Sequence, residues 1–387
     1  MNSPFVMFGC GGFNLAFTAG LFSESGLTRQ IVAVQRSRDE RSEAFFRQNG
    51  KFHVHIVGKR GGKQIDETRE IESISDLLVA SEDWSKLIAL FQSDSLKYLL
   101  TNSAERGWDI SDTDRKAELE RFSMPQCHLG KLLVLLRVRM EEKLPGLQII
   151  PFELGEQNEV RLRAKLEELL TCWMIDSSDW RQCGQRLKEY LRWSCSFRGT
   201  LVDQMVPRCD EEHPLFKSKE DLLIRIAEPY RLLVVAGKPD DDRFLEHPDA
   251  LWCGDQQPYT LRKLCILNGM HTLMAAYWQQ YGLDSKMTVD QFLDNDAAMK
   301  WLNTALSQEI LPAIEGLVPE AEEFTNEVLE RFANKALKFP ISKIAGNHIA
   351  KLGDRLGPTA RLFKQRHGAI PRTIDEVFGW AGIALSL

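Results

Sequence analysis

The strongest constraint on the fold is a cluster of glycines that follows an apolar run close to the N-terminus. Residues 5–8 (FVMF) are apolar, and residues 9–12 (GCGG) come directly after them. Residues 13–26 repeat apolar side chains every four positions, which indicates a helix, and residues 31–35 (IVAVQ) favour a strand. A strand, a glycine turn, a helix and a second strand form half of a dinucleotide-binding α/β fold, so we expect that fold here.

The glycine turn supplies the first candidate cofactor site. Glycines let the backbone approach a pyrophosphate closely, and the N-terminus of the following helix attracts its negative charge. The candidate residues are Gly9, Gly11, Gly12 and Phe13. Asn14 stands where the full G-x-G-x-x-G pattern has its third glycine, so the spacing alone also allows a glycine turn that binds no nucleotide.

The end of the second strand bears on the identity of the cofactor. An acid about 20 residues after the glycines usually binds the ribose hydroxyls of NAD. Gln35 occupies this place and offers an amide that could bond to the ribose instead. Arg36 or Arg38 could accept the 2′-phosphate of NADP, so the sequence leaves the choice between NAD and NADP open.

Three further segments read as strands. Residues 52–58 (FHVHIVG) alternate and precede a glycine turn, as in a hairpin, whereas residues 96–108 and 147–159 each run from a strand into a polar loop. Ligands of an open α/β sheet bind at the carboxyl ends of the strands, so we expect Asn102 near the cofactor and Asn158 at the same edge. The ordinary polarity of surface loops explains these side chains equally well.

The second half of the chain has a different pattern. From about residue 258 onward, amphipathic helices predominate. A chain of 387 residues is long enough for two domains, and we place the boundary near residue 195. The expected fold class is therefore α/β, with a Rossmann-type dinucleotide-binding domain (1–195) followed by a mainly α-helical substrate and catalytic domain (196–387).

Composition excludes several classes of partner. The net charge of −6 argues against nucleic acid, because phosphate binding needs a basic surface. No apolar run approaches the ~18 residues of a membrane span, and the first residues lack the basic segment of a signal peptide. The eight cysteines form no CxxC pair and no zinc spacing, so we expect free thiols, no metal and a cytoplasmic location. The oligomeric state stays open.

Residues 261–272 (LRKLCILNGMHT) place three polar side chains in an apolar helix. On an α-helix, Lys263, Asn268 and His271 lie at about 0°, 140° and 80° around the axis and thus share one side. One interpretation is a snorkelling lysine and a core histidine. The other is a site for carbonyl reduction, in which a lysine of lowered pKa exchanges a proton, an amide stabilises the alkoxide and a histidine holds the substrate.

This segment is similar to a known family. Lys263, Asn268 and His271 match the K-x4-N-x2-H pattern of the polyol-specific long-chain dehydrogenases, the mannitol dehydrogenase family. The resemblance covers nearly the whole chain, and it is carried by residues 8–17, 34–35, 62–75, 101–107, 152–158, 200–207, 258–272 and 343–351. It implies zinc-independent, reversible hydride transfer between NAD(P) and a sugar acid or polyol. The motifs look most like those of members that reduce tagaturonate to altronate.

The resemblance also implies a role for each matching residue. Lys263 would be the general acid/base. Asn268 and Asn158 would form the oxyanion hole, and His271 would help to fix the substrate. Asp203 would lie beside the substrate or the lysine.

Further matching positions concern the substrate. Glu105 would lie near the site and carry protons to solvent. Lys343 and Lys351 fall where the family places substrate-binding groups, eight residues apart on one expected helix. With His348 and Arg355 they would form a basic rim that suits a carboxylate or a phosphate, although a solvated helix face explains them too.

Two departures from the family pattern leave alternatives open. Leu15 stands where the family often has an arginine, and Glu159 follows Asn158 where it usually has glycine. The chain is also shorter than typical uronate reductases. A mannitol-1-phosphate or fructuronate enzyme of the same family therefore remains an alternative, as does a non-catalytic nucleotide-binding sensor.

Overall fold

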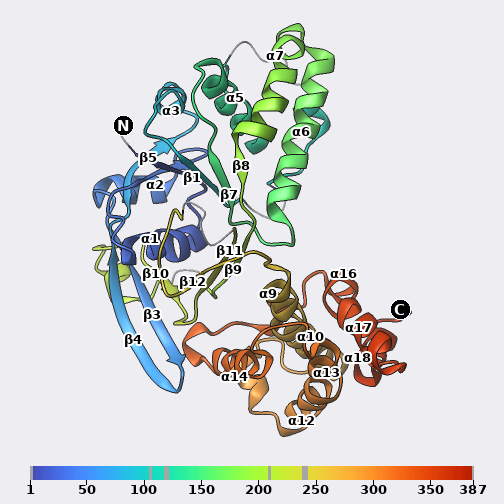
Figure 1. The fold of residues 1–387 in the computed structure, drawn as a ribbon. Coiled ribbons are helices and arrows are strands. Elements are labelled where there is room, and N and C mark those ends of the chain that lie inside the picture. Colours follow the sequence, from blue (N-terminus) through green and yellow to red (C-terminus); the bar gives the residue numbers. More distant parts are fainter. Residues whose placement is uncertain (1–2, 104–106, 117–121, 208–210, 238–242, 386–387) are drawn as a thin grey trace. The chain divides into compact units, whose positions relative to one another are not determined.

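The structure is a computed structural model that describes residues 3–103, 107–116, 122–207, 211–237 and 243–385 (Figure 1). The chain forms two compact units. Unit 1 comprises Met1–His55, Thr68–Ala227 and Arg231–Gln256. Unit 2 comprises Ile56–Glu67, Glu228–Tyr230 and Gln257–Leu387.

Unit 1 is built on a six-stranded parallel sheet in the order β5-β2-β1-β6-β7-β8. Its strands are β1 (Phe5–Phe8), β2 (Ile31–Gln35), β5 (Ile74–Val79), β6 (Tyr98–Thr101), β7 (Gln148–Pro151) and β8 (Ser196–Phe197). Most of these strands are short apolar runs that are buried almost throughout, as expected for a parallel sheet covered on both faces. The Rossmann-type fold predicted from the glycine turn is confirmed.

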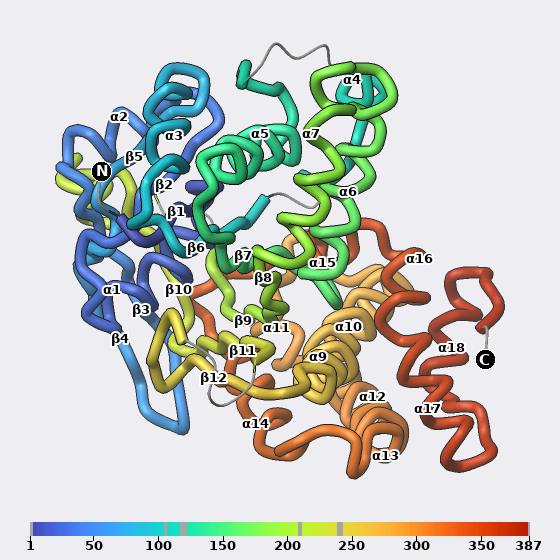
Figure 2. The backbone as a smooth tube through the Cα atoms, turned by 45° about the horizontal axis from the view of Figure 1, so that its top comes forward, coloured from blue at the N-terminus to red at the C-terminus, as the bar shows by residue number. Residues whose placement is uncertain are grey.

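Helices cover this sheet. They are η1 (Asn14–Ala19), α1 (Gly20–Glu24), α2 (Glu40–Arg47), α3 (Trp84–Phe91), α4 (Asp112–Arg115), α5 (His128–Glu141), α6 (Asn158–Asp176), α7 (Ser178–Glu189) and η2 (Tyr190–Ser194). Helix α5 is buried along most of its length and packs against α3 and α6, and α6 lies beside α7 (Figure 2). Arg139 of α5 is buried too, and its guanidinium donates to the carbonyls of Phe91, Ser93, Leu96 and Pro145.

The other strands of the described residues form two three-stranded sheets. One has the order β10-β3-β4, with β3 (Phe52–Arg60), β4 (Lys63–Ile71) and β10 (Arg225–Ala227), and it confirms the hairpin predicted from residues 52–58. The other has the order β12-β11-β9, with β9 (Thr200–Asp203), β11 (Leu232–Ala236) and β12 (Ala250–Cys253). A short helix, α8 (Pro214–Lys217), precedes β10.

The chain leaves unit 1 for the last time after Gln256, whereas the sequence pattern placed the boundary near residue 195. A buried ion pair explains why the last segment stays with unit 1. The guanidinium of Arg231 donates to Glu24 of α1 at 2.9 and 2.7 Å and to Asp249 at 3.2 Å. The change to helical composition is visible in the sequence, but this long-range pair is not.

A second buried pair assigns residues 228–230 to unit 2. Glu228 accepts hydrogen bonds of 2.7–3.1 Å from Arg331 of α14, and the Arg331 guanidinium lies 4.2 Å from the ring centroid of Tyr230. Residues 228 and 231 are only three positions apart. Their charged partners nevertheless lie in different units, so the chain crosses between the units at this point.

Unit 2 is mainly helical, as predicted. Its helices are α9 (Gln257–Arg262), η3 (Lys263–Asn268), α10 (Gly269–Gln280), α11 (Val289–Leu293), α12 (Asp296–Ala305), η4 (Leu306–Ile310), α13 (Leu311–Ile314), α14 (Ala321–Phe332), η5 (Lys335–Leu337), α15 (Ile341–Ile344), α16 (His348–Lys351), η6 (Leu352–Leu356), α17 (Gly357–His367) and α18 (Arg372–Trp380). Helix α10 is central, and α12, α15, α16, α18 and η6 pack around it. Among the helices of the described ranges, none has both the length and the apolar character that a membrane span requires.

The tip of the β3–β4 hairpin belongs to unit 2 because it is bound to α14 and to the residues that follow it. The backbone N–H groups of Gly61 and Gly62 donate to the two carboxylate oxygens of Glu330 at 2.9 and 2.8 Å. The Asn334 amide donates to the carbonyl of Val57 at 2.8 Å. These bonds satisfy the polar backbone of a turn that would otherwise rely on water.

Candidate active site

The glycine turn after β1 has a backbone shape that only glycine adopts easily. Gly9 has φ of +102°, and a Cβ there would lie 2.4 Å from the backbone oxygen of Asn102. Gly11 is exposed, and a Cβ there would meet no atom within 4 Å. The turn is therefore tight on the sheet side and open at Gly11, which fits a cradle for a dinucleotide pyrophosphate.

Asn14 replaces the third glycine of the motif and closes the turn. Its Nδ2 donates to the carbonyl of Gly9 at 2.7 Å, and its Oδ1 accepts from Thr18 at 3.1 Å. The side chain is buried at the start of the π-helix η1. Phe13, the residue before it, stacks on Phe17 with ring centroids 4.8 Å apart. Asn14 thus fixes the turn by hydrogen bonds, and the missing glycine does not disturb it.

The carboxyl end of β2 carries Gln35, which is buried. Its Nε2 donates to the carbonyl of Ser37 at 3.0 Å, whereas its Oε1 is buried and has no hydrogen-bond partner among the described residues. Arg38 forms ion pairs with Glu82 at 2.8 Å and Glu43 at 2.7 Å. The positive charge of Arg38 is therefore already balanced by two carboxylates.

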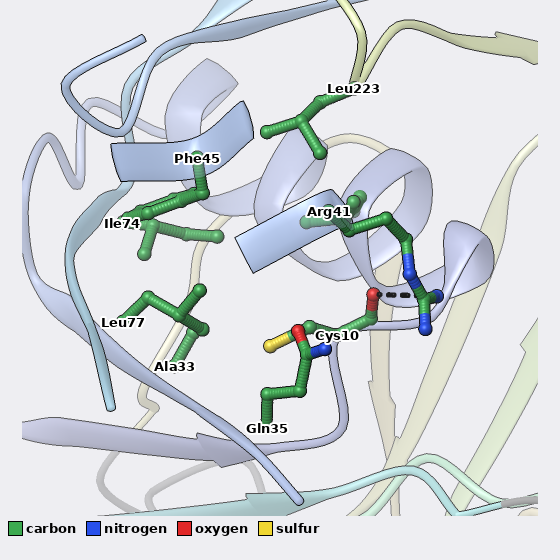
Figure 3. A pocket seen from close by; sticks show the side chains of 9 residues that line it. Cys10, Ala33, Gln35, Arg41, Phe45, Ile74, Leu77 and Leu223 are labelled. Atoms are coloured by element: carbon green, nitrogen blue, oxygen red, sulfur yellow. Dashed lines mark hydrogen bonds between the residues drawn. The ribbon is translucent and has the colours of Figure 1, made fainter. Parts of the chain in front are cut away.

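An apolar pocket with about 250 Å³ of empty space, part of it open to solvent, lies beside the turn (Figure 3). It is lined by Cys10, Leu15, Ala33, Gln35, Arg41, Phe45, Ile74, Leu77 and Leu223. Arg41 donates to the carbonyl of Cys10 at 3.5 Å. Burial raises the pKa of the Cys10 thiol to about 12, so this thiol stays protonated at neutral pH and is a poor nucleophile.

The carboxyl ends of β6 and β7 are joined by a buried acid. Glu153 accepts hydrogen bonds from the Thr101 hydroxyl (2.9 Å) and from the backbone N–H and hydroxyl of Ser103 (2.9 and 3.2 Å). Burial raises the pKa of this carboxyl. Beside it, the Asn102 amide donates to the carbonyl of Phe152 at 3.0 Å. The patterns above do not single out Glu153, although an acid directly after a buried strand is a signal that could have found it.

Asn158 is occupied by structural hydrogen bonds. Its Nδ2 lies 3.0–3.2 Å from four acceptors, namely the carbonyls of Pro151, Glu153 and Thr200 and the Thr200 hydroxyl, and its Oδ1 accepts from the Thr200 N–H at 3.1 Å. An amide has only two N–H donors. Both already have acceptors, so these contacts do not support the oxyanion role expected of Asn158. The side chain joins β7 to β9 instead.

Two acids lie near Asn158 in the chain or in the fold. Asp203 is buried at the end of β9, opposite Leu232 of β11. Glu159, the departure from the family pattern, is half-buried in the first turn of α6. Glu105 lies outside the described residues. Within the described ranges, no group of three or more His, Cys, Asp or Glu side chains is placed to hold a metal ion.

In unit 2, a π-helical turn sets the spacing of the candidate catalytic residues. The N–H of Gly269 bonds to the carbonyl of Leu264, five residues back, which is the π-helix pattern. Lys263 and Asn268, also five apart, therefore stand one turn apart along this segment. The prediction from α-helix geometry, a separation of about 140° around the axis, was wrong in this respect. His271 follows three residues after Asn268 and faces the same side.

Side chains of α14 pack against this helical segment at Arg262 and His271. His271 is buried, and its ring lies 4.5 Å from that of Phe332. Lys263 and Asn268 are half-buried. Arg262, the residue before Lys263, has its guanidinium 4.4 Å from the Phe324 ring centroid and donates to the carbonyl of Pro319, in the loop before α14, at 3.0 Å.

Lys343 and Lys351 do not share one helix, contrary to expectation. Helix α15 ends at Ile344, Asn347 has φ of +55°, and α16 begins at the next residue. The helix is interrupted there, and the Lys351 ammonium donates to the carbonyl of Ile344 at 2.8 Å. This hydrogen bond places the Lys351 ammonium at the end of the helix that carries Lys343. Helices α15 and α16 both pack against α10, which carries His271.

Comparisons with known proteins match both parts of the chain. The model of the mannitol dehydrogenase Rossmann domain matches residues 3–245, and that of the mannitol dehydrogenase C-terminal domain matches residues 255–381. Altronate oxidoreductase of Bacillus subtilis is 26% identical over 368 residues, which cover 91% of this chain and 72% of that protein. Altronate oxidoreductase of Phocaeicola vulgatus is 24% identical over 396 residues, which cover 98% of this chain and 79% of that protein.

Two solved structures share the fold. A substrate-free D-sorbitol dehydrogenase gives a TM-score of 0.78 at 20% identity, covering 93% of this chain and 76% of that one. Pseudomonas fluorescens mannitol 2-dehydrogenase, in a ternary complex with NAD and D-mannitol, gives a TM-score of 0.77 at 19% identity. The match covers 98% of this chain and 78% of that one. The two family models together account for most of the sequence. The chain therefore belongs to the mannitol dehydrogenase family, whose members are NAD-dependent dehydrogenases that act on CH–OH groups.

Proposed function

We propose that this chain catalyses reversible hydride transfer between NAD and a sugar acid or polyol, with the reduction of tagaturonate to altronate as its most specific form. The observation that carries the proposal is the π-helical turn, which sets Lys263 and Asn268 one turn apart on the helix that also presents His271. This arrangement offers a proton donor, a neutral hydrogen-bond donor and a positioning imidazole from one rigid element.

The chemistry of a ketone reduction assigns a task to each residue. NADH, when bound, supplies the hydride. The carbonyl oxygen becomes an alkoxide, and the Lys263 ammonium gives it a proton. The Asn268 amide donates a hydrogen bond to the same oxygen as its charge develops. His271, held against Phe332, positions a hydroxyl of the substrate. In the reverse direction, neutral Lys263 accepts the proton of the alcohol, so the chemistry needs no zinc.

The residues around the glycine turn support NAD as the cofactor. The buried Oε1 of Gln35 is an acceptor at the place where a ribose hydroxyl would donate. Glu43 and Glu82 neutralise Arg38, so this arginine offers little net attraction to a 2′-phosphate. We therefore propose that NADH is preferred over NADPH.

The basic groups on α15 and α16 bear on the substrate. Lys343 is exposed and Lys351 is half-buried beside the end of α15. Such groups suit the carboxylate of a sugar acid, in line with the relatives named altronate oxidoreductase. A phosphate would suit them as well, so a polyol phosphate or fructuronate is the second candidate.

A substrate panel tests the proposal. Loss of NADH and of NADPH absorbance would be followed with tagaturonate, fructuronate, fructose and fructose 6-phosphate. We expect turnover with tagaturonate and NADH. Turnover of another member would replace the substrate but keep the chemistry. No turnover with any member, in a chain that binds NADH by calorimetry, would contradict the proposal and favour a non-catalytic nucleotide-binding protein.

A further inference from the structure

The glycine turn lacks a basic side chain of its own. Residues 9–15 read GCGGFNL, and Leu15 is buried in the apolar pocket. A dinucleotide pyrophosphate carries two negative charges, whereas a helix N-terminus supplies only about half a positive charge. If the turn binds a pyrophosphate, the remaining positive charge must come from another part of the chain.

One arginine from a distant part of the sequence lies directly against the turn. Strand β10 packs on η1, the helix that follows the glycines. Leu223, just before β10, lines the pocket together with Cys10 and Leu15. A Cβ at Gly12 would lie 3.3 Å from Nε and 3.4 Å from Cδ of Arg225, so the side chain of Arg225 covers Gly12.

Arg225 is also held firmly. It is only 7% exposed, and its Nη1 donates to the carbonyl of Ile224 at 2.8 Å. A guanidinium binds phosphate through short, charge-assisted hydrogen bonds, which are strongest where water is largely excluded. The planar fork of five N–H donors lets one group bond to the protein while others face a phosphate.

We infer that Arg225 is a cofactor-binding residue that supplies the positive charge for the dinucleotide pyrophosphate at the glycine turn. The inference rests on the proposed function, since it takes the turn to be the cofactor site. It adds a residue about 200 positions away from the motif, on a strand of another sheet. Arg225 does not touch the reacting atoms in this assignment, so its effect is on binding.

Calorimetry with a series of ligands tests this assignment without any turnover. The ligands are adenosine, AMP, ADP and NADH, and the proteins are the wild type, Arg225→Met, Arg225→Lys and the control Arg192→Met. Arg192 is an exposed arginine of unit 1 that lies over the ring of Trp193. We expect Arg225→Met to bind ADP and NADH at least about tenfold more weakly, the scale of hydrogen bonds to charged groups, while adenosine affinity stays within about twofold.

The remaining comparisons separate binding from folding. Arg225→Lys keeps the positive charge but not the planar fork, so we expect its loss of ADP affinity to be smaller than that of Arg225→Met. Because Arg225→Met lacks the charge, its ADP affinity should depend less on salt than that of the wild type. Unchanged ADP and NADH affinity in Arg225→Met would overturn the inference and leave the proposed function intact. An equal loss for adenosine and ADP would show a merely structural arginine and overturn it as well. A wild type that binds neither ADP nor NADH would remove the proposed function itself.

Discussion

The two candidate sites of this protein are built in different ways. In unit 1, polar side chains at the carboxyl ends of the strands are bonded to the backbone around them, as Asn14, Asn102 and Asn158 show. In unit 2, the polar residues come from one helix, and a single π-helical turn sets their spacing. In the proposed function, the first arrangement holds loops in place for binding, whereas the second presents groups for chemistry. The difference teaches that the residue type alone does not assign a role, because an asparagine occurs in both.

The largest expected effect separates chemistry from binding. Lys263→Ala removes the proposed proton donor, so we expect turnover to fall by at least about a hundredfold, the scale of general acid–base catalysis. NADH affinity should stay unchanged, since the proposed cofactor residues lie in unit 1. Steady-state kinetics and calorimetry measure the two quantities. Lys286→Ala, at an exposed lysine of unit 2, is the control and should keep full turnover. Near-wild-type turnover in Lys263→Ala would remove this lysine from the mechanism.

The two asparagines give the next comparison. Asn158→Ala leaves the Thr200 N–H without its acceptor and removes the two amide donors that the surrounding carbonyls share, so we expect a loss of about 1–3 kcal/mol in the free energy of unfolding. Asn268→Ala should lower turnover with little change in stability. Urea unfolding and kinetics on both variants test the contrast. If Asn158→Ala folds as stably as the wild type but loses turnover, Asn158 belongs to the oxyanion hole after all.

Acid should lower the free energy of unfolding by protonating Glu24, which is paired with Arg231 in unit 1. Burial opposes ionisation there, but hydrogen bonds from His247 and Arg231 and the charges of Arg231 and Arg69 outweigh it and hold the pKa of Glu24 well below its usual range. Because the folded pKa is lowered, this stabilisation is present above the unfolded pKa of ~4.3 and is lost as the pH falls further.

The corresponding variant is Glu24→Gln. We expect it to lose roughly 2 kcal/mol at neutral pH, less than for a fully buried pair because the Glu24 side chain is 21% exposed. The unfolding free energy of the wild type should fall more steeply below about pH 5 than that of the variant. Urea unfolding across pH measures both slopes, with the exposed Glu246→Gln as control. If the unfolding free energies of the wild type and Glu24→Gln change with pH in parallel, Glu24 is not responsible for the loss of stability in acid.

The smallest expected effect concerns the cofactor. Replacing both Glu43 and Glu82 by Gln leaves Arg38 with an unbalanced charge, which should attract a 2′-phosphate. These groups are about half exposed, so we expect the preference for NADH over NADPH to fall by only about fivefold. The ratio of kcat/KM for the two cofactors measures it. An unchanged ratio would place the determinant elsewhere, with Arg36 as the next variant.

Much of the architecture was predictable because it depends on local patterns. The strand–turn–helix–strand unit at residues 5–35 and the hairpin from residue 52 follow from periodicity and glycines, which act within a few residues. The helical second half follows in the same way. The pairing of Lys343 with Lys351 on one helix was wrong, because Asn347 breaks the expected helix with a left-handed backbone. The adjacent Gly346 and Asn347 are a local signal for this break that the helix prediction overlooked.

By itself, the sequence determined the fold class, the position of the glycine turn and the membership of Lys263, Asn268 and His271 in one motif. Tertiary structure decided which polar groups form hydrogen bonds or close contacts within the protein, and with which partners. Asn158 is held by Thr200, Arg225 lies on Gly12, and the chain leaves unit 1 for the last time after Gln256. The physical reason is that these facts depend on contacts between residues tens to hundreds of positions apart, whose hydrogen bonds and charges no local pattern records.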